Sequence, residues 1–159
     1  MMAMLGWLES TAFSVWVREG ETIWAFPTIL TLHTFGLGLL VGTAAVVNLR
    51  LLGLGIGPRL PLSPLRSLFG VMWGGFWLNL VTGSMLFVAD ASRRGPSVLF
   101  WTKILFVAIG ISTTVLIKRA VFDTPTDPTV PEPPARTLAL LSLFAWTAAI
   151  VAGRLLAYV

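Results

Sequence analysis

The chain has 159 residues, of which 56% are hydrophobic and only 11% are charged. A soluble domain carries about a quarter charged residues, so this composition excludes a water-soluble globular protein. The net charge of +4 comes from cations spread between apolar runs, unlike the clustered basic face of a nucleic-acid-binding protein. The absence of cysteine excludes disulfides, covalently attached c-type haem, iron–sulfur clusters and thiolate metal sites.

A short amphipathic helix is predicted at the start of the chain, over residues 4–18. Such a helix is typical of a segment that lies in the membrane interface. A signal peptide is the competing interpretation, but no Lys or Arg precedes the apolar residues and no small-residue cleavage site follows them. The apolar residues that recur at helical spacing are Leu5, Leu8, Ala12, Val15 and Trp16.

Four stretches that follow are long and apolar enough to cross a bilayer, which takes about 20 helical residues. The third and fourth each contain one cation, Lys103 and Arg154 respectively. The sequence therefore predicts an all-α integral membrane four-helix bundle, preceded by the interfacial helix, that forms a single domain over residues 1–159. The predicted spans lie at about 22–49, 68–89, 98–117 and 137–158.

Basic residues in the loops predict the orientation, because cytoplasmic loops of membrane proteins are enriched in Lys and Arg. The first and third loops with their flanks contain six cations, whereas the opposite side contains three outside the spans. We therefore expect a multi-pass protein of a bacterial inner membrane with both termini outside. The six cations are Arg50, Arg59, Arg66, Lys118, Arg119 and Arg136, and the three are Arg18, Arg93 and Arg94.

His33 is the only histidine of the chain and lies about ten residues into the first span. A rise of 1.5 Å per residue places it roughly 15 Å deep, near the bilayer midplane. An ionisable group at this depth is costly, which makes a functional role the working hypothesis. Two interpretations stay open: a neutral histidine hydrogen-bonded to a neighbouring helix, or an axial ligand to the iron of a b-type haem, since neutral imidazole is a good iron ligand.

The same depth arithmetic predicts two layers of residues around this histidine. Asn79 and Thr147 should lie level with it, near the midplane, whereas Met85, Lys103 and Arg154 should lie roughly 6–9 Å nearer the outer face. A haem would fit this arrangement, with the two cations on the propionates. The iron would then have the histidine alone, a histidine–methionine pair, or a site shared between subunits.

The two embedded cations also allow an interpretation without a cofactor, because lysine and arginine near helix ends reach the membrane surface with no ligand at all. In that case their counter-charge should come from Asp90, Glu19 or Glu21 at the outer rim. Carboxylate partners for both cations would favour a structural role, and an open cleft beside the histidine would favour a cofactor.

Small residues at four-residue spacing predict close contacts between helices, because they let helix backbones approach one another. The same faces would also leave room for a flat macrocycle. The predicted faces are Thr34, Gly38 and Gly42 in the first span, Gly70 and Gly74 in the second, and Ala145, Ala149 and Gly153 in the fourth.

No complete catalytic constellation occurs in the sequence. The spans contain no H-E-x-x-H motif, no glycine-rich phosphate loop and no pair of carboxylates. A transporter driven by protons or ions would place acidic residues in the membrane, and the predicted spans contain none. A transporter is therefore the weakest of the functional classes considered.

The segment T-L-H-T-F-G-L-G-L-L-V-G-T, followed by N-L-R-L-L-G, resembles a family of small bacterial four-helix membrane proteins. The likeness continues through W-G-G-F and V-T-G in the second span, K-I-L-F in the third and A-G-R-L-L-A-Y at the end, so it covers nearly the whole chain. More distantly, the order of features is similar to that of the HemJ-type protoporphyrinogen oxidases and of the membrane domain of the copper-resistance D proteins. The resemblance to the oxidases implies that His33 and Lys103 belong to a haem-associated motif. Those oxidases carry a further histidine after their first helix, where this chain has Asn48–Leu51.

These observations favour a small membrane protein associated with redox chemistry. It would bind haem b through His33, with further cofactor contacts from Lys103, Arg154, Met85 and Asn79, and an oxidase-like activity is implied only by the distant resemblance. The alternative is an accessory structural subunit of a larger respiratory or photosynthetic membrane complex with no cofactor of its own. The expected partners are membrane lipids and other membrane subunits or further copies of the chain, and not nucleic acid.

Overall fold

The computed structural model describes residues 2–54, 62–123 and 133–158. Every regular element in these residues is helical. The chain divides into two compact units. Unit 1 comprises Met1–Leu40 and Trp73–Val98, and unit 2 comprises Val41–Met72 and Leu99–Val159.

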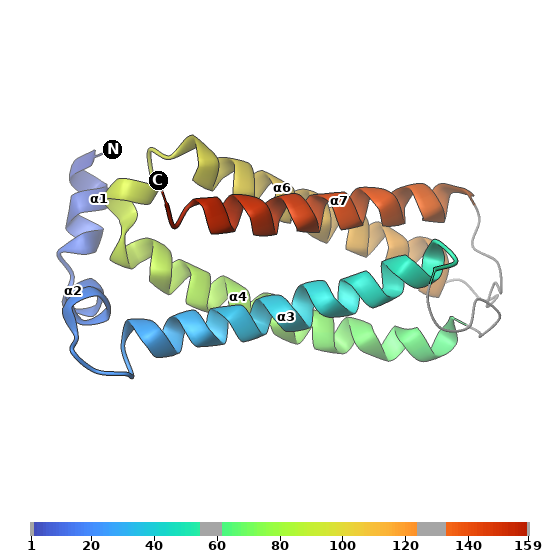
Figure 1. The fold of residues 1–159 in the computed structure, drawn as a ribbon, viewed down its shortest axis with the longest axis horizontal. Coiled ribbons are helices and arrows are strands. Elements are labelled where there is room, and N and C mark those ends of the chain that lie inside the picture. Colours follow the sequence, from blue (N-terminus) through green and yellow to red (C-terminus); the bar gives the residue numbers. More distant parts are fainter. Residues whose placement is uncertain (1, 55–61, 124–132, 159) are drawn as a thin grey trace. The chain divides into compact units, whose positions relative to one another are not determined.

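Four of the helices in the described residues are long and apolar enough to cross a membrane, which confirms the prediction of an all-α membrane bundle. Two of them match the predicted spans at both ends, whereas the last begins at Pro133 instead of near residue 137. Proline is well suited to the first turn of a helix, where its missing N–H removes no hydrogen bond. The helices are α1 (Met2–Glu9), α2 (Ala12–Glu19), α3 (Phe26–Leu51), α4 (Leu68–Ala89), α5 (Ala91–Arg94), α6 (Val98–Ile117) and α7 (Pro133–Leu155) (Figure 1).

The segment before α3 forms two short helices, which corrects the prediction of one helix over residues 4–18. The break falls at Ser10 and Thr11. Thr11 has an extended backbone, and its Oγ1 accepts a hydrogen bond from the backbone N–H of Ser14 at 3.4 Å, so it caps α2. The apolar spacing that predicted a single helix continues across the break, and only the capping pair marks where the chain turns.

Helix α2 is attached to the ends of α3 and α4 within unit 1. The Ser14 hydroxyl is fully buried and lies 2.7 Å from the carbonyl oxygen of Leu8 and 3.2 Å from that of Val88. An apolar cluster continues this contact and joins the short helix α2 to α3 and α4, which are long enough to span a membrane. Its buried members are Val17, Ile29 and Ala89, and Met85 and Leu86 pack against them.

Helix α1 is attached to α5 because a carboxylate of α1, that of Glu9, caps the N-terminus of α5. Glu9 Oε1 accepts a hydrogen bond from the backbone N–H of Ser92 at 2.7 Å. Asp90, the residue before α5, makes no capping hydrogen bond and pairs instead with Arg94 at 3.1 Å. The Ser92 backbone N–H is the main reason that the pKa of Glu9 lies below its ordinary value.

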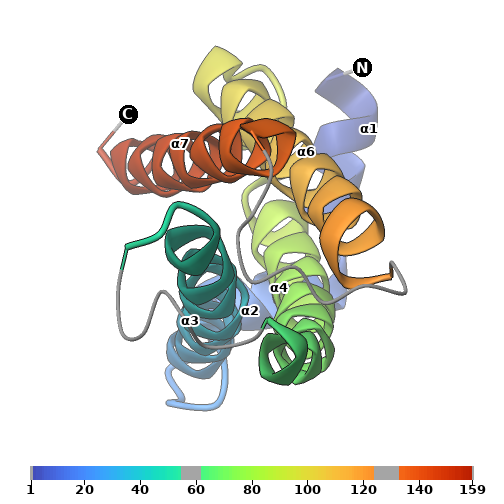
Figure 2. The same cartoon turned by 90° about the vertical axis from the view of Figure 1, so that its right-hand side faces the viewer.

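In unit 2, α6 and α7 run antiparallel and pack closely (Figure 2). The indole of Trp146 lies so close to Gly110 that a Cβ atom there would be 2.7 Å from Trp146 Cε2. Nearer the other end of the pair, a Cβ atom at Gly153 would lie 3.4 Å from Lys103 Cε. The end of α3 joins α7 through a buried hydrogen bond that Asn48 Nδ2 donates to the Ser142 hydroxyl at 2.9 Å.

The Glu9–Ser92 contact predicts a pH-dependent attachment of α1. Because the pKa of Glu9 is lowered in the folded chain, the contact contributes stability that is complete above the ordinary pKa of glutamate and is lost as the pH falls through the lowered value. Glu9→Gln should lower the hydrogen-exchange protection of the Ser92 amide at neutral pH, whereas Glu19→Gln should not. Equal protection of this amide in the wild type and the Glu9 variant would contradict the assignment.

Candidate functional site

The candidate site in unit 1 is built around His33 of α3, whose side chain is half-buried. Its Nδ1 lies 3.0 Å from Thr82 Oγ1 on α4, and that hydroxyl lies 2.6 Å from the carbonyl oxygen of Leu78. Because a hydroxyl has only one proton and the Leu78 contact is the shorter, we assign that proton to Leu78. The lone pair of Thr82 Oγ1 then accepts from Nδ1–H, and in the neutral form of the imidazole this tautomer has its lone pair on Nε2.

The imidazole ring of His33 packs closely against α4 because residue 83 of that helix is a glycine. A Cβ atom at Gly83 would lie 3.1 Å from His33 Cε1 and 3.6 Å from its Nδ1, which is tighter than ordinary side-chain packing. Gly83 follows Thr82 directly in the chain. The hydrogen bond and the glycine surface together therefore fix the plane of the imidazole and the direction of its Nε2.

Asn79 lies level with His33, as the depth arithmetic predicted. Its Nδ2 donates a hydrogen bond to the backbone carbonyl oxygen of His33 at 3.2 Å. Asn79 therefore bonds to the helix that carries the histidine, and its contact with His33 is to the backbone. Its role in the structure is to hold α3 against α4 at this depth.

The two helix backbones meet one turn further along, at Gly36 and Gly75. A Cβ atom at Gly75 would lie 2.7 Å from the backbone nitrogen of Leu40 and 2.8 Å from the carbonyl oxygen of Gly36. A Cβ atom at Gly36 would lie 2.7 Å from Asn79 Nδ2. Neither position has room for a side chain, so these two glycines set how closely α3 and α4 approach.

The predicted glycine faces in the first two spans are wrong, because Gly38, Gly42, Gly70 and Gly74 are exposed and a Cβ atom at any of them would meet nothing within 4 Å. Four-residue spacing identifies one side of a helix, but it does not say which side meets a neighbour. The predicted face of α7 is confirmed, since Ala145 and Ala149 are buried and Gly153 touches Lys103.

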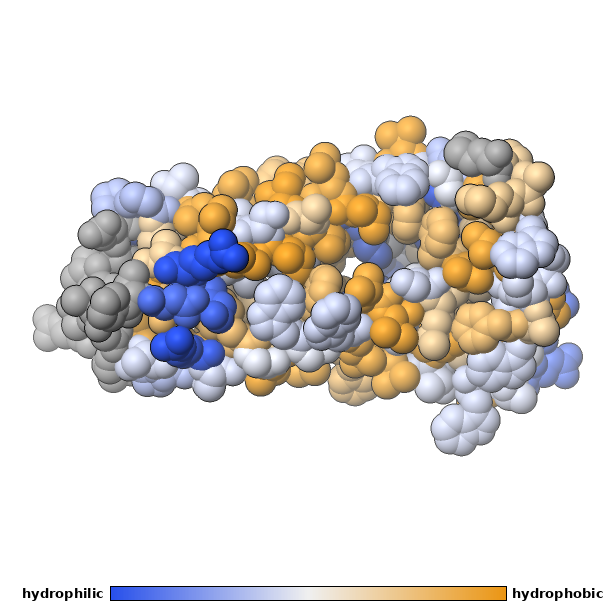
Figure 3. All heavy atoms as spheres, turned by 180° about the vertical axis from the view of Figure 1, so that it is seen from behind, coloured by the Kyte–Doolittle hydropathy of each residue, from blue (hydrophilic) through white to orange (hydrophobic). Residues whose placement is uncertain are grey.

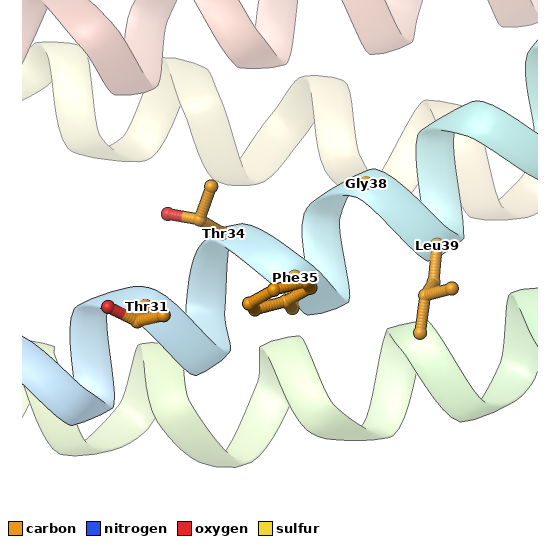
Figure 4. A pocket seen from close by; sticks show the side chains of 5 residues that line it. All are labelled: Thr31, Thr34, Phe35, Gly38 and Leu39. Carbon is orange, nitrogen blue, oxygen red and sulfur yellow. The ribbon is translucent and has the colours of Figure 1, made fainter.

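The predicted face of α3 instead borders a shallow outward depression of about 360 Å³. Figure 4 shows its lining on one stretch of α3. The depression is mostly apolar, with two threonine side chains at its edge. Its lining residues are Thr31, Thr34, Phe35, Gly38 and Leu39.

Two further residues of the predicted layers, Met85 and Thr147, lie in different units and have different surroundings. Met85 packs against the apolar cluster that joins α2, α3 and α4, which gives its side chain a role in the core of unit 1. Thr147, predicted to lie at the level of His33, is on the exposed side of α7 in unit 2.

The two embedded cations behave differently from each other in unit 2. Lys103 is half-buried, and its stem lies against the α7 backbone at Gly153. Arg154 is exposed, and its guanidinium carbon lies 5.8 Å from the ring centre of Tyr158, one turn further along the chain. A cation over an aromatic ring gains electrostatic stabilisation without a carboxylate partner.

Two of the three carboxylates expected to balance these cations pair with other residues in unit 1. Asp90 forms an ion pair with Arg94, and Glu19 forms one with Arg18, both at 3.1 Å. The physical reason is proximity, since each carboxylate has an arginine within four residues in the chain. Asp90 and Glu19 therefore each have an arginine partner within unit 1.

Thr82 and Gly83 are the site residues that the sequence analysis did not assign. The signal for them was the V-T-G motif of the second span, which the resemblance included without giving its residues a role. Comparison of the chain with protein-family models, curated proteins and solved structures gave no match. The functional argument therefore depends on the geometry around His33.

The close approach of α3 and α4 gives a prediction with a control at the adjacent residue. Gly75→Ala should destabilise the chain by about 1–3 kcal/mol, because the added methyl group must displace backbone atoms of α3. Gly74→Ala adds the same methyl group where a Cβ atom would meet nothing within 4 Å, and it should leave the stability unchanged. Unfolding in mixed micelles measures both, and equal midpoints for the two variants would contradict the packing.

Proposed function

We propose that this chain is a small integral membrane protein associated with redox chemistry and that it binds haem b through His33. The observation that supports the proposal is the chain of hydrogen bonds from His33 Nδ1 to Thr82 and on to Leu78. Histidines that bind a metal almost always donate their other ring N–H to an acceptor, which fixes the tautomer and the ring orientation. His33 has this arrangement, with Thr82 as the acceptor.

The residues present fit a haem ligand in their donor chemistry. A neutral imidazole with its lone pair on Nε2 is a common protein ligand of haem iron, and Gly83 holds the ring in one plane. When bound, haem would supply one-electron transfer. The chain has one histidine, so the proposal commits to a single histidine ligand, His33.

The sequence places one cation a few residues inside each of the third and fourth spans, Lys103 and Arg154 respectively, and the resemblance to the HemJ-type oxidases implies a haem-associated role for Lys103. Those oxidases have a second histidine where this chain has Asn48–Leu51. We therefore extend the proposal to haem binding and electron transfer and not to the oxidase reaction.

The test is the absorption spectrum of the purified chain titrated with haem. The wild type should give a Soret band that His33→Ala abolishes. Thr82→Val keeps the shape of the side chain but removes the acceptor of Nδ1–H, and it should weaken haem binding about 10–100-fold. Thr82→Ser should retain wild-type affinity.

A matched control separates the loss of the Thr82 acceptor from the removal of any threonine hydroxyl in the membrane. Thr31→Val removes an exposed hydroxyl of α3 that bonds only the backbone oxygen of Pro27 among its described contacts. This variant should bind haem as the wild type does. An unchanged Soret band in His33→Ala, or equal losses in the Thr31 and Thr82 variants, would exclude His33 as the ligand.

The accessory-subunit function is the second candidate, and the outward depression on α3 favours it. Gly38 and its neighbours leave this helix surface indented, and small residues on an exposed membrane helix suit contact with another helix. This function would give a chain that co-purifies with a fixed set of membrane subunits and has no chromophore. Gly38→Leu would then reduce the co-purification, and His33→Ala would leave it unchanged.

The proposed location is a bacterial inner membrane with both termini outside, supported by the excess of basic residues in the first and third loops. The chain contains no cysteine, so single introduced cysteines report topology without background. Trp7→Cys, at an exposed residue of α1, should react with an impermeant maleimide in intact cells. Ser67→Cys, before α4, should react only after the membrane is opened, and the reverse pattern would overturn the orientation.

A further inference from the structure

A cluster of charged side chains forms where α6 ends in unit 2. The helix continues as a π-helical turn over Lys118–Phe122, and the wider turn brings residues five apart onto one side. Lys118 Nζ donates to both carboxylate oxygens of Asp123, at 3.0 and 3.2 Å. Arg66, from the 3-10 turn over Ser63–Ser67 before α4, donates to Asp123 Oδ1 at 3.2 Å.

The backbone under this cluster is held by an aromatic contact. Phe122 and Phe69 are both buried, and their rings meet edge-to-face with centres 5.0 Å apart. Phe122 directly precedes Asp123, and Phe69 of α4 lies three residues after Arg66, so this contact holds together the two segments that the Arg66–Asp123 ion pair also joins. The charged side chains therefore extend from a fixed support.

The cluster carries an excess of positive charge. Arg119 is exposed and lies beside Lys118 in the chain, and Arg66 is 63% exposed in its side chain. Asp123 pairs with Arg66 and Lys118, and together with Arg119 these four residues carry two positive charges in excess. In Figure 3, hydrophilic side chains (blue) gather at one end of the displayed face, next to apolar ones (orange). We call Arg66, Lys118, Arg119 and Asp123 the basic cluster.

Apolar surface adjoins the basic cluster on the same helix. Leu116 lies in the last turn of α6, three residues before Arg119 of the π-helical turn, and it is 49% exposed. The apolar span of α6 continues from there toward Val98. A ligand with a negative head and an apolar tail would match both surfaces.

We propose that the basic cluster binds the phosphate of an anionic phospholipid headgroup, with the acyl chains along the exposed side of α6. The positive charge attracts the phosphate, and each basic residue near an anionic membrane surface strengthens such binding several-fold. The adjoining Leu116 selects a lipid over free phosphate, because only the lipid has a tail to bury there. The inference concerns a surface of unit 2 and does not depend on haem binding at His33.

The test is a competition between lipids on the full chain. Detergent-solubilised protein is mixed with equimolar phosphatidylglycerol and phosphatidylcholine, and native mass spectrometry measures the ratio of the two bound lipids. The wild type should bind phosphatidylglycerol in excess. Arg119→Gln should lower the ratio about fivefold, whereas Arg119→Lys, which keeps the charge, should retain it.

The control is Arg93→Gln, which removes the same charge from an exposed residue of α5 in unit 1 and should leave the ratio unchanged. Inorganic phosphate added at the lipid concentration should not displace phosphatidylglycerol. An equal ratio in the wild type, equal losses in the Arg93 and Arg119 variants, or displacement by inorganic phosphate would each overturn the proposal.

Discussion

The contact between the backbones of α3 and α4 at Gly36 and Gly75 is the constraint on which the His33 site depends. It leaves no room for a side chain at either glycine, and it therefore fixes both the distance and the register of the two antiparallel helices. With this register, Asn79 reaches the His33 carbonyl oxygen and Thr82 reaches the imidazole. A larger residue at Gly75 would separate the helices and remove the hydrogen-bond acceptor of the only histidine.

The same register explains how a polar group is accommodated deep in an apolar helix. A buried polar atom without a partner costs several kcal/mol where no water is present, so each one must find its partner within the protein. In unit 1, His33 Nδ1 pairs with Thr82, whose hydroxyl is itself bonded to its own helix. In a neutral imidazole held in this way, the hydrogen bond at Nδ1 fixes the direction of Nε2 and leaves the lone pair on that nitrogen. Haem ligation requires a nitrogen with such a lone pair.

The sequence predicts the four spans and the level of His33 and Asn79, because length, hydropathy and rise per residue determine both. It does not predict which side of a helix meets its neighbour, and for that reason Gly38 was assigned to a contact that Gly36 makes. Periodicity also missed the break at Thr11, where a single capping hydroxyl outweighs a continuous apolar face. The motifs T-F-G, W-G-G-F and V-T-G, which carry the resemblance, contain Gly36, Gly75 and Thr82, but only the three-dimensional packing gives these residues a role.

The protonation of the His33 ring is the measurement that tests this account most directly. With a single histidine in the chain, selective ¹⁵N labelling of histidine gives the ring signals of His33 alone in lipid bilayers. The account predicts a neutral ring with its proton on Nδ1 and none on Nε2, and a switch of this preference in Thr82→Val. A proton on Nε2 in the wild type, or a doubly protonated ring at neutral pH, would contradict the role given to Thr82 and with it the haem proposal.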